Sequence, residues 1–215
     1  SYGQPKFLVY SGAPHIGSGD VEHKEVSLDK PKLLYVGKLI KRKNTDVLIK
    51  AISHLKSRFD FHLTIIGEGP ERKSLERLIL DLKLTDCIEI IGKMSRESVL
   101  EHMSKADIFV MVSRQETFGL VYLEAMSQKC ITIGSKGEGI DGIIKDGENG
   151  FLVDTENVEV LVNRLENIFT TDINELKKIA NNAYNTALDM TEENMATRYL
   201  STVEKIIMAN GKEKA

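Results

Sequence analysis

Short apolar runs alternate with longer amphipathic stretches along most of this chain. The apolar runs lie at residues 33–36, 61–66, 88–91, 108–112, 130–133 and 151–153, and the main amphipathic stretches lie at 46–55, 74–82, 98–103, 120–127 and 158–169. Runs without in/out alternation are typical of strands buried on both faces, and helix-length segments between them favour βαβ units. The pattern therefore predicts an α/β fold with a doubly wound, Rossmann-like parallel sheet.

Two further helices are expected near the end of the chain. Residues 172–188 have helical spacing, and Thr191 is suited to cap another helix. One face of that last helix carries the apolar residues Met195, Tyr199, Val203, Ile206 and Ile207. Such a stripe needs a covering partner, whereas the charged end at 212–215 is expected to fray.

Composition narrows the classes of protein. With 215 residues, of which 41% are hydrophobic and 28% charged, the chain can form one large or two small soluble domains. A net charge of -3 argues against nucleic acid as a partner, although Lys38, Lys41, Arg42 and Lys43 form a local basic cluster. No apolar run approaches the roughly 20 residues that span a bilayer, and no signal peptide opens the chain. We therefore expect a cytoplasmic protein.

The residues that could hold a metal or cofactor are sparse. Cys87 and Cys130 are too few for a disulfide framework or a thiolate site, so we expect buried, reduced thiols. The five histidines lack ligand spacing, and the chain has neither a G-x-x-x-x-G-K-[ST] sequence nor a D-x-D pair. We expect no metal and no cofactor. Lysines and helix ends would then have to neutralise any bound diphosphate.

Small residues follow five of the apolar runs. They are Gly37, Gly67, Gly92, Ser113 and Gly134. Because ligands of open α/β sheets bind at the carboxyl ends of the strands, this placement favours a ligand-binding edge. The alternative is ordinary turn chemistry, since glycine supplies turns anywhere.

The segment Ser113–Met126 carries the strongest candidate chemistry. Glu116 and Glu124 have seven residues between them, and Gly119 stands in the turn where the second carboxylate's helix begins. The free N–H groups and positive dipole end of that helix suit an anion, which the two carboxylates would flank at different depths. The alternative is an amphipathic helix with a solvated acid at each end.

Three other segments are weaker indicators. Residues 137–142 match G-x-G-x-x-G, but the turn signal at 146–150 leaves no room for the long helix that a dinucleotide site requires, so we reject that assignment. Residues 67–71 bring two glycines to a strand end, as in some phosphate loops. Residues 37–44 place several cations at a strand exit, where they could bind a diphosphate or form a solvated basic loop.

Taken in order, these motifs resemble the C-terminal half of family 4, or group 1, retaining glycosyltransferases, whose GT-B architecture has two Rossmann domains. The similarity spans residues 33–207. It is carried by Gly37–Leu39 with Lys43, by 65–70, 91–92 and 106–110, by the segment from Ser113 to Met126, by 146–153 and by the helix after Thr191. The resemblance implies one half of a GT-B fold.

The resemblance also implies residue roles. Lys38 and Lys43 would bind the diphosphate of a nucleotide sugar of UDP or GDP type, and Lys38 stands where the family usually has the bidentate arginine. The base and distal phosphate would meet backbone of Gly37, Gly67, Lys93, Met94, Phe118, Gly119, Leu120 and Val121. Glu124 would bind the ribose, and Glu116 would face the reacting sugar, with Glu116, Lys43 and Lys38 as the catalytic group.

Four departures from the family pattern accompany these roles. Lys38 is the first, Asn44 stands where glycine is common, residues 140–142 replace a common acidic residue and Cys130 stands where proline is common. Apart from the lysine, none of them removes a contact that the resemblance implies.

Domain organisation follows from the same resemblance. Residues 1–30 would be a linker or interdomain remnant, 31–190 the nucleotide-sugar-binding domain, and 191–215 a helix that packs on an N-terminal domain absent from these residues. That domain would bind a glycan or lipid-linked acceptor, with peripheral association at the cytoplasmic face of a membrane, and the present chain would be inactive without it. The alternatives are a non-catalytic nucleotide-sugar-binding subunit of a two-chain transferase and a sugar-nucleotide epimerase of the same architecture.

Overall fold

A single parallel sheet organises the molecule. The computed structural model describes residues 24, 26–117, 119–191, 193–197 and 200–201. The six strands are β1 (Lys32–Val36), β2 (His62–Ile66), β3 (Ile88–Gly92), β4 (Ile108–Val110), β5 (Ile131–Ser135) and β6 (Phe151–Val153). They lie in the order β3-β2-β1-β4-β5-β6, and every neighbouring pair is parallel. The predicted doubly wound α/β fold is confirmed.

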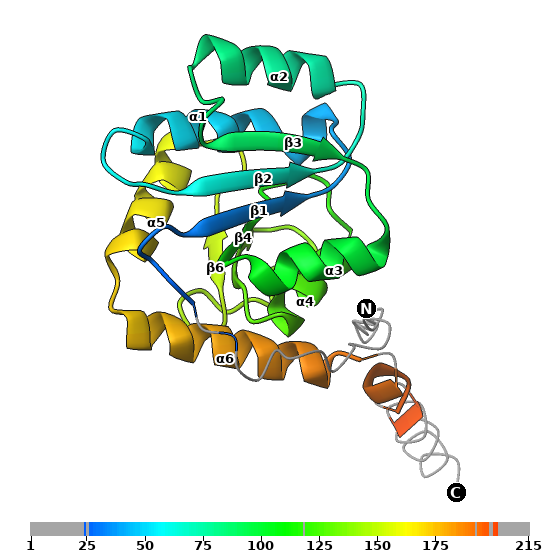
Figure 1. The fold of residues 1–215 in the computed structure, drawn as a ribbon. Helices are drawn as coiled ribbons and strands as arrows, with labels where there is room; N and C mark the ends of the chain where they lie inside the picture. Colours follow the sequence, from blue (N-terminus) through cyan, green and yellow to red (C-terminus); the bar gives the residue numbers. More distant parts are fainter. Residues whose placement is uncertain (1–23, 25, 118, 192, 198–199, 202–215) are drawn as a thin grey trace, which may run out of the picture.

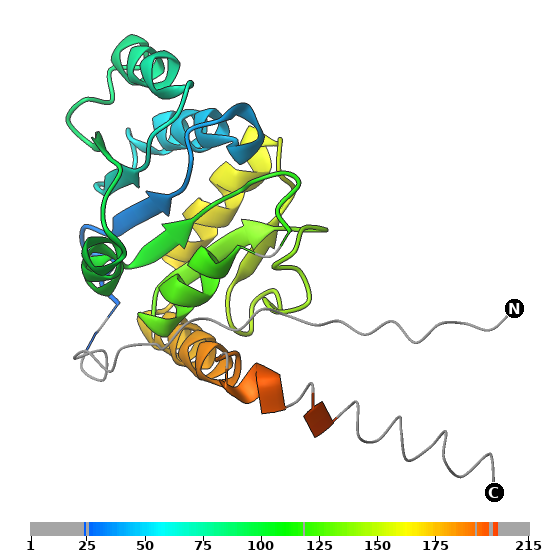
Figure 2. The same cartoon turned by 90° about the vertical axis from the view of Figure 1, so that its right-hand side faces the viewer.

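Helices cover both faces of the sheet. Their bounds are α1 (Thr45–Leu55), α2 (Arg72–Asp81), α3 (Arg96–Lys105), α4 (Leu120–Ser127), α5 (Val158–Thr170) and α6 (Ile173–Asp189), and a short 3-10 turn, η2, spans Lys41–Lys43. α1 contacts α2 and α5 in one layer, whereas α4 contacts α3 and α6 in the other (Figures 1 and 2). The strand order reverses between β1 and β4, which is the position where folds of this kind bind ligands.

The central strands explain the continuous apolar runs. Every residue of β4 and β5 is buried, because helices cover both faces of the sheet. The rings of Phe109 on β4 and Tyr122 on α4 meet edge to face, with centroids 5.8 Å apart. Cys87 and Cys130 are buried and free, as predicted, and burial raises the pKa of both thiols.

Three strand ends differ from the prediction. Gly92 is the last residue of β3 rather than the residue that follows the strand. β4 ends at Val110, before Met111 and Val112, and β5 continues through Ser135, so Gly134 lies inside a strand rather than after it. The physical reason for glycine there is packing, because a Cβ atom on Gly134 would lie 2.8 Å from Cγ2 of Ile140. The prediction that Gly134 follows its strand is therefore wrong.

The connection from β5 to β6 contains no helix among residues 136–150, all of which the structure describes. Turns and isolated bridges occupy it, which confirms the rejection of a dinucleotide-binding helix after 137–142. Near the chain end, Oγ1 of Thr191 accepts a hydrogen bond from the N–H of Asn194 at 3.3 Å, so the predicted cap is present. Tyr199, Val203, Ile206 and Ile207 of the predicted stripe lie outside the described residues.

No helix in the described part of the chain is long and apolar enough to cross a membrane.

Candidate functional site

The loops that leave β1 and β4 meet at the point where the strand order reverses. The N–H of Arg114 donates to the carbonyl oxygen of Arg42 at 2.7 Å, and the Arg42 guanidinium donates to the carbonyl of Gln115 at 2.8 Å. The buried amide Nδ2 of Asn44 donates to the carbonyl of Val112 at 2.9 Å. Because the two loops are fixed to each other, the side chains they carry share one edge of the sheet.

Lys43 and Glu116 form an ion pair across these loops. Their side chains are only 12% and 14% exposed, so water screens the pair weakly. Ser113 also donates its hydroxyl to Oε2 of Glu116 at 3.3 Å. The structure therefore brings together two of the predicted catalytic residues, one from each loop.

The backbone of Glu116 is held by a residue that the sequence did not indicate. Its N–H donates to Oε2 of Glu138 at 2.7 Å, and its carbonyl accepts from the N–H of Gly139 at 2.9 Å. Glu138 lies in the loop after β5, in the segment considered only as a dinucleotide motif. Its position after β5, at the same edge of the sheet, is the feature of the sequence that could have indicated a role for Glu138.

A glycine of positive φ begins helix α4. Gly119 has φ 69°, and a Cβ atom there would lie 2.6 Å from the Tyr122 ring. The N–H groups of Leu120 and Val121 have no hydrogen-bond partner among the described residues. They can therefore donate to an anion at the helix start. Phe118, the neighbouring residue of the predicted site, lies outside the described residues.

Glu124 lies further along α4 and contacts helix α3. Its side chain is 14% exposed, and its Oε1 accepts from Nε of Arg96 at 2.7 Å. Arg96 is the first residue of α3 and follows the exposed Lys93 and the half-buried Met94. No sequence motif marks Arg96, because charged residues in the first turn of a helix are common.

The glycines at the first two strand exits bring three loops into close contact. A Cβ atom on Gly67 would lie 1.9 Å from the carbonyl oxygen of Gly37. The N–H of Gly37 donates to the carbonyl oxygen of Ile66 at 3.0 Å, and the N–H of Gly67 donates to the carbonyl oxygen of Gly92 at 2.9 Å. Close backbone approach accounts for Gly67, and the Tyr35 hydroxyl, 2.9 Å from a Cβ atom built on Gly37, accounts for Gly37, whether or not a ligand binds beside them.

Lys38 is exposed next to this contact. Its ammonium group makes no hydrogen bond or ion pair with the described residues, so its charge is available to a ligand.

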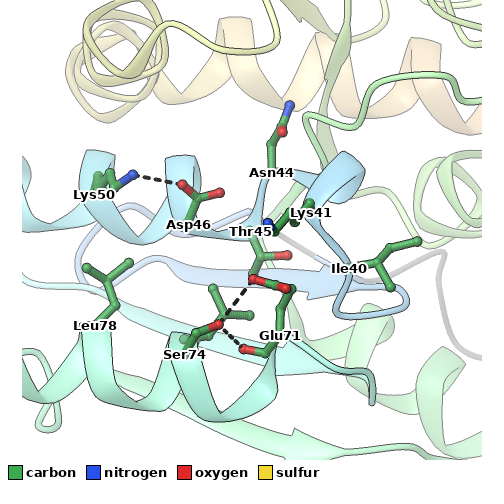
Figure 3. A pocket seen from close by; sticks show the side chains of 10 residues that line it. Ile40, Lys41, Asn44, Thr45, Asp46, Lys50, Glu71, Ser74 and Leu78 are labelled. Atoms are coloured by element: carbon green, nitrogen blue, oxygen red, sulfur yellow. Dashed lines mark hydrogen bonds and ion pairs between the residues drawn. The ribbon is translucent and has the colours of Figure 1, made fainter.

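One pocket of the described residues lies away from this edge. It measures about 430 Å³ and lies between the η2–α1 segment and α2, as Figure 3 shows. Two polar pairs lie within it, Lys50 with Asp46 at 2.7 Å and the Ser74 hydroxyl with the Glu71 carbonyl at 2.7 Å. We place the functional site at the Lys43–Glu116 edge instead, because cations, carboxylates and unoccupied N–H donors converge there and no predicted site residue lines this cavity.

The described residues contain no group of three or more histidine, cysteine, aspartate or glutamate side chains that could hold a metal ion.

Comparison with known proteins identifies the family. The sequence profile of the family "Glycosyl transferases group 1" matches residues 20–186. The chain belongs to this family. Alpha-D-kanosaminyltransferase of Streptomyces kanamyceticus is 32% identical over 154 residues, which cover 68% of this chain and 40% of that protein. The lipopolysaccharide core biosynthesis glycosyltransferase of Rhizobium meliloti is 28% identical over 159 residues, covering 74% and 45% respectively. The chain thus spans less than half the length of these curated relatives.

Solved structures of other proteins share the fold. Sucrose-phosphate synthase from Thermosynechococcus elongatus superposes with a TM-score of 0.77 at 22% identity, over 94% of this chain and 53% of that one. HepE from Anabaena, solved in complex with UDP and glucose, gives a TM-score of 0.73 at 21% identity, over 82% and 49%. The sheet of this member of the group 1 family is accordingly one Rossmann-like half of a GT-B fold, as its sequence indicated.

Proposed function

We propose that the chain is the donor-binding domain of a retaining glycosyltransferase, which transfers a sugar from a nucleotide-diphosphate sugar to an acceptor. One observation carries the proposal. At the point where the strand order reverses, Lys43 and Glu116 meet across two loops, next to unoccupied N–H donors at the start of α4. This edge combines positive charge for a diphosphate with a carboxylate for a sugar.

The diphosphate would be bound by two kinds of donor. Lys38 and Lys43 would supply charge, and the N–H groups of Leu120 and Val121 would supply directed hydrogen bonds at the positive end of α4. Lys38 has no competing partner among the described residues, whereas Lys43 would exchange Glu116 for a phosphate oxygen. The unpaired Lys38 and the paired Lys43 would thus both bind the diphosphate, and no metal is needed in this proposal.

The nucleoside would bind on the other side of Gly119. Glu124 would accept hydrogen bonds from the ribose hydroxyls, and the backbone at Lys93 and Met94, just after β3, would contact the base edge. Gly37 and Gly67 would line the phosphate-facing loops, and a side chain on Gly67 would separate these loops. We propose UDP or GDP as the nucleotide part, in line with the UDP complex of the Anabaena structure.

The chemistry would rest on electrostatic stabilisation. Departure of the nucleoside diphosphate leaves negative charge on the phosphates and a cationic sugar. Lysines and helix N–H groups placed at the phosphates act where negative charge develops, and a donor of this kind is typically worth about 3 kcal/mol. Once Lys43 turns to the phosphate, the Glu116 carboxylate is free to face the sugar. Retention of configuration, by attack on the face that the leaving group departs from, is the outcome that the family resemblance implies.

Acceptor binding would require surface that the described residues do not supply. We propose that an N-terminal Rossmann domain provides it and that the acceptor is a glycan or lipid-linked glycan, as in polysaccharide or glycoconjugate synthesis. The names of the curated relatives, which include the lipopolysaccharide core transferase, support this class. Catalysis by the present residues alone is therefore not expected, whereas donor binding is.

Calorimetric titration tests the proposal directly. UDP and GDP are titrated into the wild type, Lys43→Ala and Lys56→Ala, the last being a control because Lys56 pairs with Asp86 on the exposed surface. We expect Lys43→Ala to weaken binding by about 10- to 100-fold, the effect of losing one charged hydrogen bond, and Lys56→Ala to bind as the wild type does. Equal affinities for wild type and Lys43→Ala would overturn the phosphate role. The absence of heat with every nucleotide would overturn the function.

A further inference from the structure

Arg96 and Glu124 join the two helices on either side of the expected nucleoside position. Nε of Arg96 donates to Oε1 of Glu124 at 2.7 Å. The carboxylate is largely covered, at 14% exposure, whereas the Arg96 side chain is 44% exposed. α3 and α4 lie side by side on the same face of the sheet (Figures 1 and 2). The contact therefore fixes a mostly buried carboxylate from outside its own helix.

The position of Arg96 is itself fixed by the start of α3. Ser95 is the N-cap, and its side-chain oxygen accepts from the N–H of Ser98 at 3.2 Å. Because the cap sets where the helix begins, the Arg96 side chain starts one residue, Ser95, after the segment Lys93–Met94. The proposed base contact and the proposed ribose contact are thus linked through one side chain.

The contact leaves Glu124 able to bind a ligand. An ionised carboxylate offers about four lone-pair positions, and the hydrogen bond from Arg96 uses one of them. Oε2 of Glu124 has no hydrogen-bond partner among the described residues, so it can accept a ribose hydroxyl while Oε1 keeps Arg96. A carboxylate already held in one orientation loses little conformational freedom when it binds.

We propose that Arg96 is a positioning residue that holds Glu124 for recognition of the ribose 2′- and 3′-hydroxyls, so that the site selects ribonucleotides over 2′-deoxyribonucleotides. This inference rests on the proposed donor-binding function. Arg96 acts through Glu124 and needs no contact with the nucleotide. Its removal lets the carboxylate rotate, which weakens the hydrogen bonds to the ribose and leaves those to the phosphates unchanged.

The experiment compares two nucleotides on three proteins. UDP and 2′-deoxy-UDP, with GDP and 2′-deoxy-GDP in parallel, are titrated into the wild type, Arg96→Ala and Lys105→Ala. Lys105 is a matched control, because it lies on the same helix and its ion pair with Glu101 lies within that helix. We expect Arg96→Ala to weaken binding of the ribonucleotide about tenfold, as for loss of one charged contact, and to weaken binding of the deoxy form, which keeps only the 3′-hydroxyl contact, by about threefold at most. The ratio of the two affinities therefore falls in Arg96→Ala and is unchanged in Lys105→Ala.

Each other outcome overturns the inference in a recognisable way. Tighter binding of UDP by Arg96→Ala would show that Arg96 competes with the ribose. Equal weakening of both nucleotides would show a general structural role, and no change would show no role. If the wild type binds none of the four nucleotides, the donor-binding function itself fails, whereas wild-type binding without an Arg96 effect defeats only the positioning role.

Discussion

The ammonium group of Lys43 and the carboxylate of Glu116, 73 residues apart in sequence, form a largely buried ion pair at the centre of the sheet edge. Each group satisfies the other, so neither charge is stranded in a poorly solvated position. A diphosphate can replace Glu116 as the partner of Lys43 without leaving the cation unpaired. The Lys43 ammonium is therefore neutralised in the free protein, and it can exchange the Glu116 carboxylate for a bound diphosphate.

Substitution of Glu116 by glutamine tests this exchange. Glu116→Gln keeps the shape of the side chain and removes the negative charge that competes for Lys43. We expect a nucleoside diphosphate to bind about fivefold more tightly, the opposite of the Lys43→Ala effect, because the cation no longer has to leave an anionic partner. Calorimetry at low salt measures the change. Asp86→Asn, which removes the carboxylate of an exposed ion pair, is the control. Weaker binding by Glu116→Gln would show that the carboxylate supports the phosphate contact instead.

Gly67→Ala tests the close approach of the first two strand exits. The added Cβ atom would lie 1.9 Å from the carbonyl oxygen of Gly37, and backbone cannot yield as a flexible side chain can. We expect the free energy of unfolding to fall by about 3 kcal/mol or more. Gly147→Asn is the control, because a Cβ atom there meets nothing within 4 Å and asparagine tolerates its φ of 78°. Urea denaturation of both variants measures the difference, and equal losses would contradict the steric explanation.

Asn44 explains one departure from the family pattern. Its φ of 49° is left-handed, which suits the glycine that is common there, but its amide also donates to the carbonyls of Val112 and Thr155 at 2.9 and 3.0 Å. Asn44→Gly should lose about 1 to 2 kcal/mol of unfolding free energy with these hydrogen bonds. Asn44→Asp should lose more, about 3 kcal/mol, because it directs a carboxylate at two carbonyl oxygens. Denaturation curves at pH 7 give the order, and an aspartate variant as stable as the wild type would refute it.

The sequence predicted the fold well because burial on both faces leaves a local signature. The apolar runs of β4 and β5 needed only their composition to be predicted as strands buried on both faces. The order of the strands in the sheet is different, since it depends on which crossover packs where, and no local pattern encodes it. Strand ends were displaced at Gly134 and after Val110 for the same reason: tertiary packing decides where a ladder stops.

The candidate site was predicted in part. Lys43, Glu116 and Glu124 lie at the expected sheet edge, because parallel strands place all their carboxyl ends together. Glu138 and Arg96 escaped notice because a charged residue in a loop or first helical turn is ordinarily solvated, and only its partner in space gives it a role. The direct pairing of Lys43 with Glu116 could likewise not be predicted, because it depends on how the two loops lie relative to each other.

Ionisation of the Tyr35 phenol should lower the stability of the fold at alkaline pH. Burial, with a smaller contribution from the charge of Glu116, raises the pKa of its phenol from 10.0 to about 12. Because the folded-state pKa lies above the unfolded value, the neutral phenol stabilises the fold fully below about pH 10, and this contribution is lost as pH rises towards 12. The loss should reach about 2 kcal/mol at pH 12. Urea denaturation of the wild type and Tyr35→Phe at pH 8, 10 and 11.5 measures it, with the phenylalanine variant losing less stability than the wild type over that interval. Parallel losses in the two proteins would show that other groups set the limit.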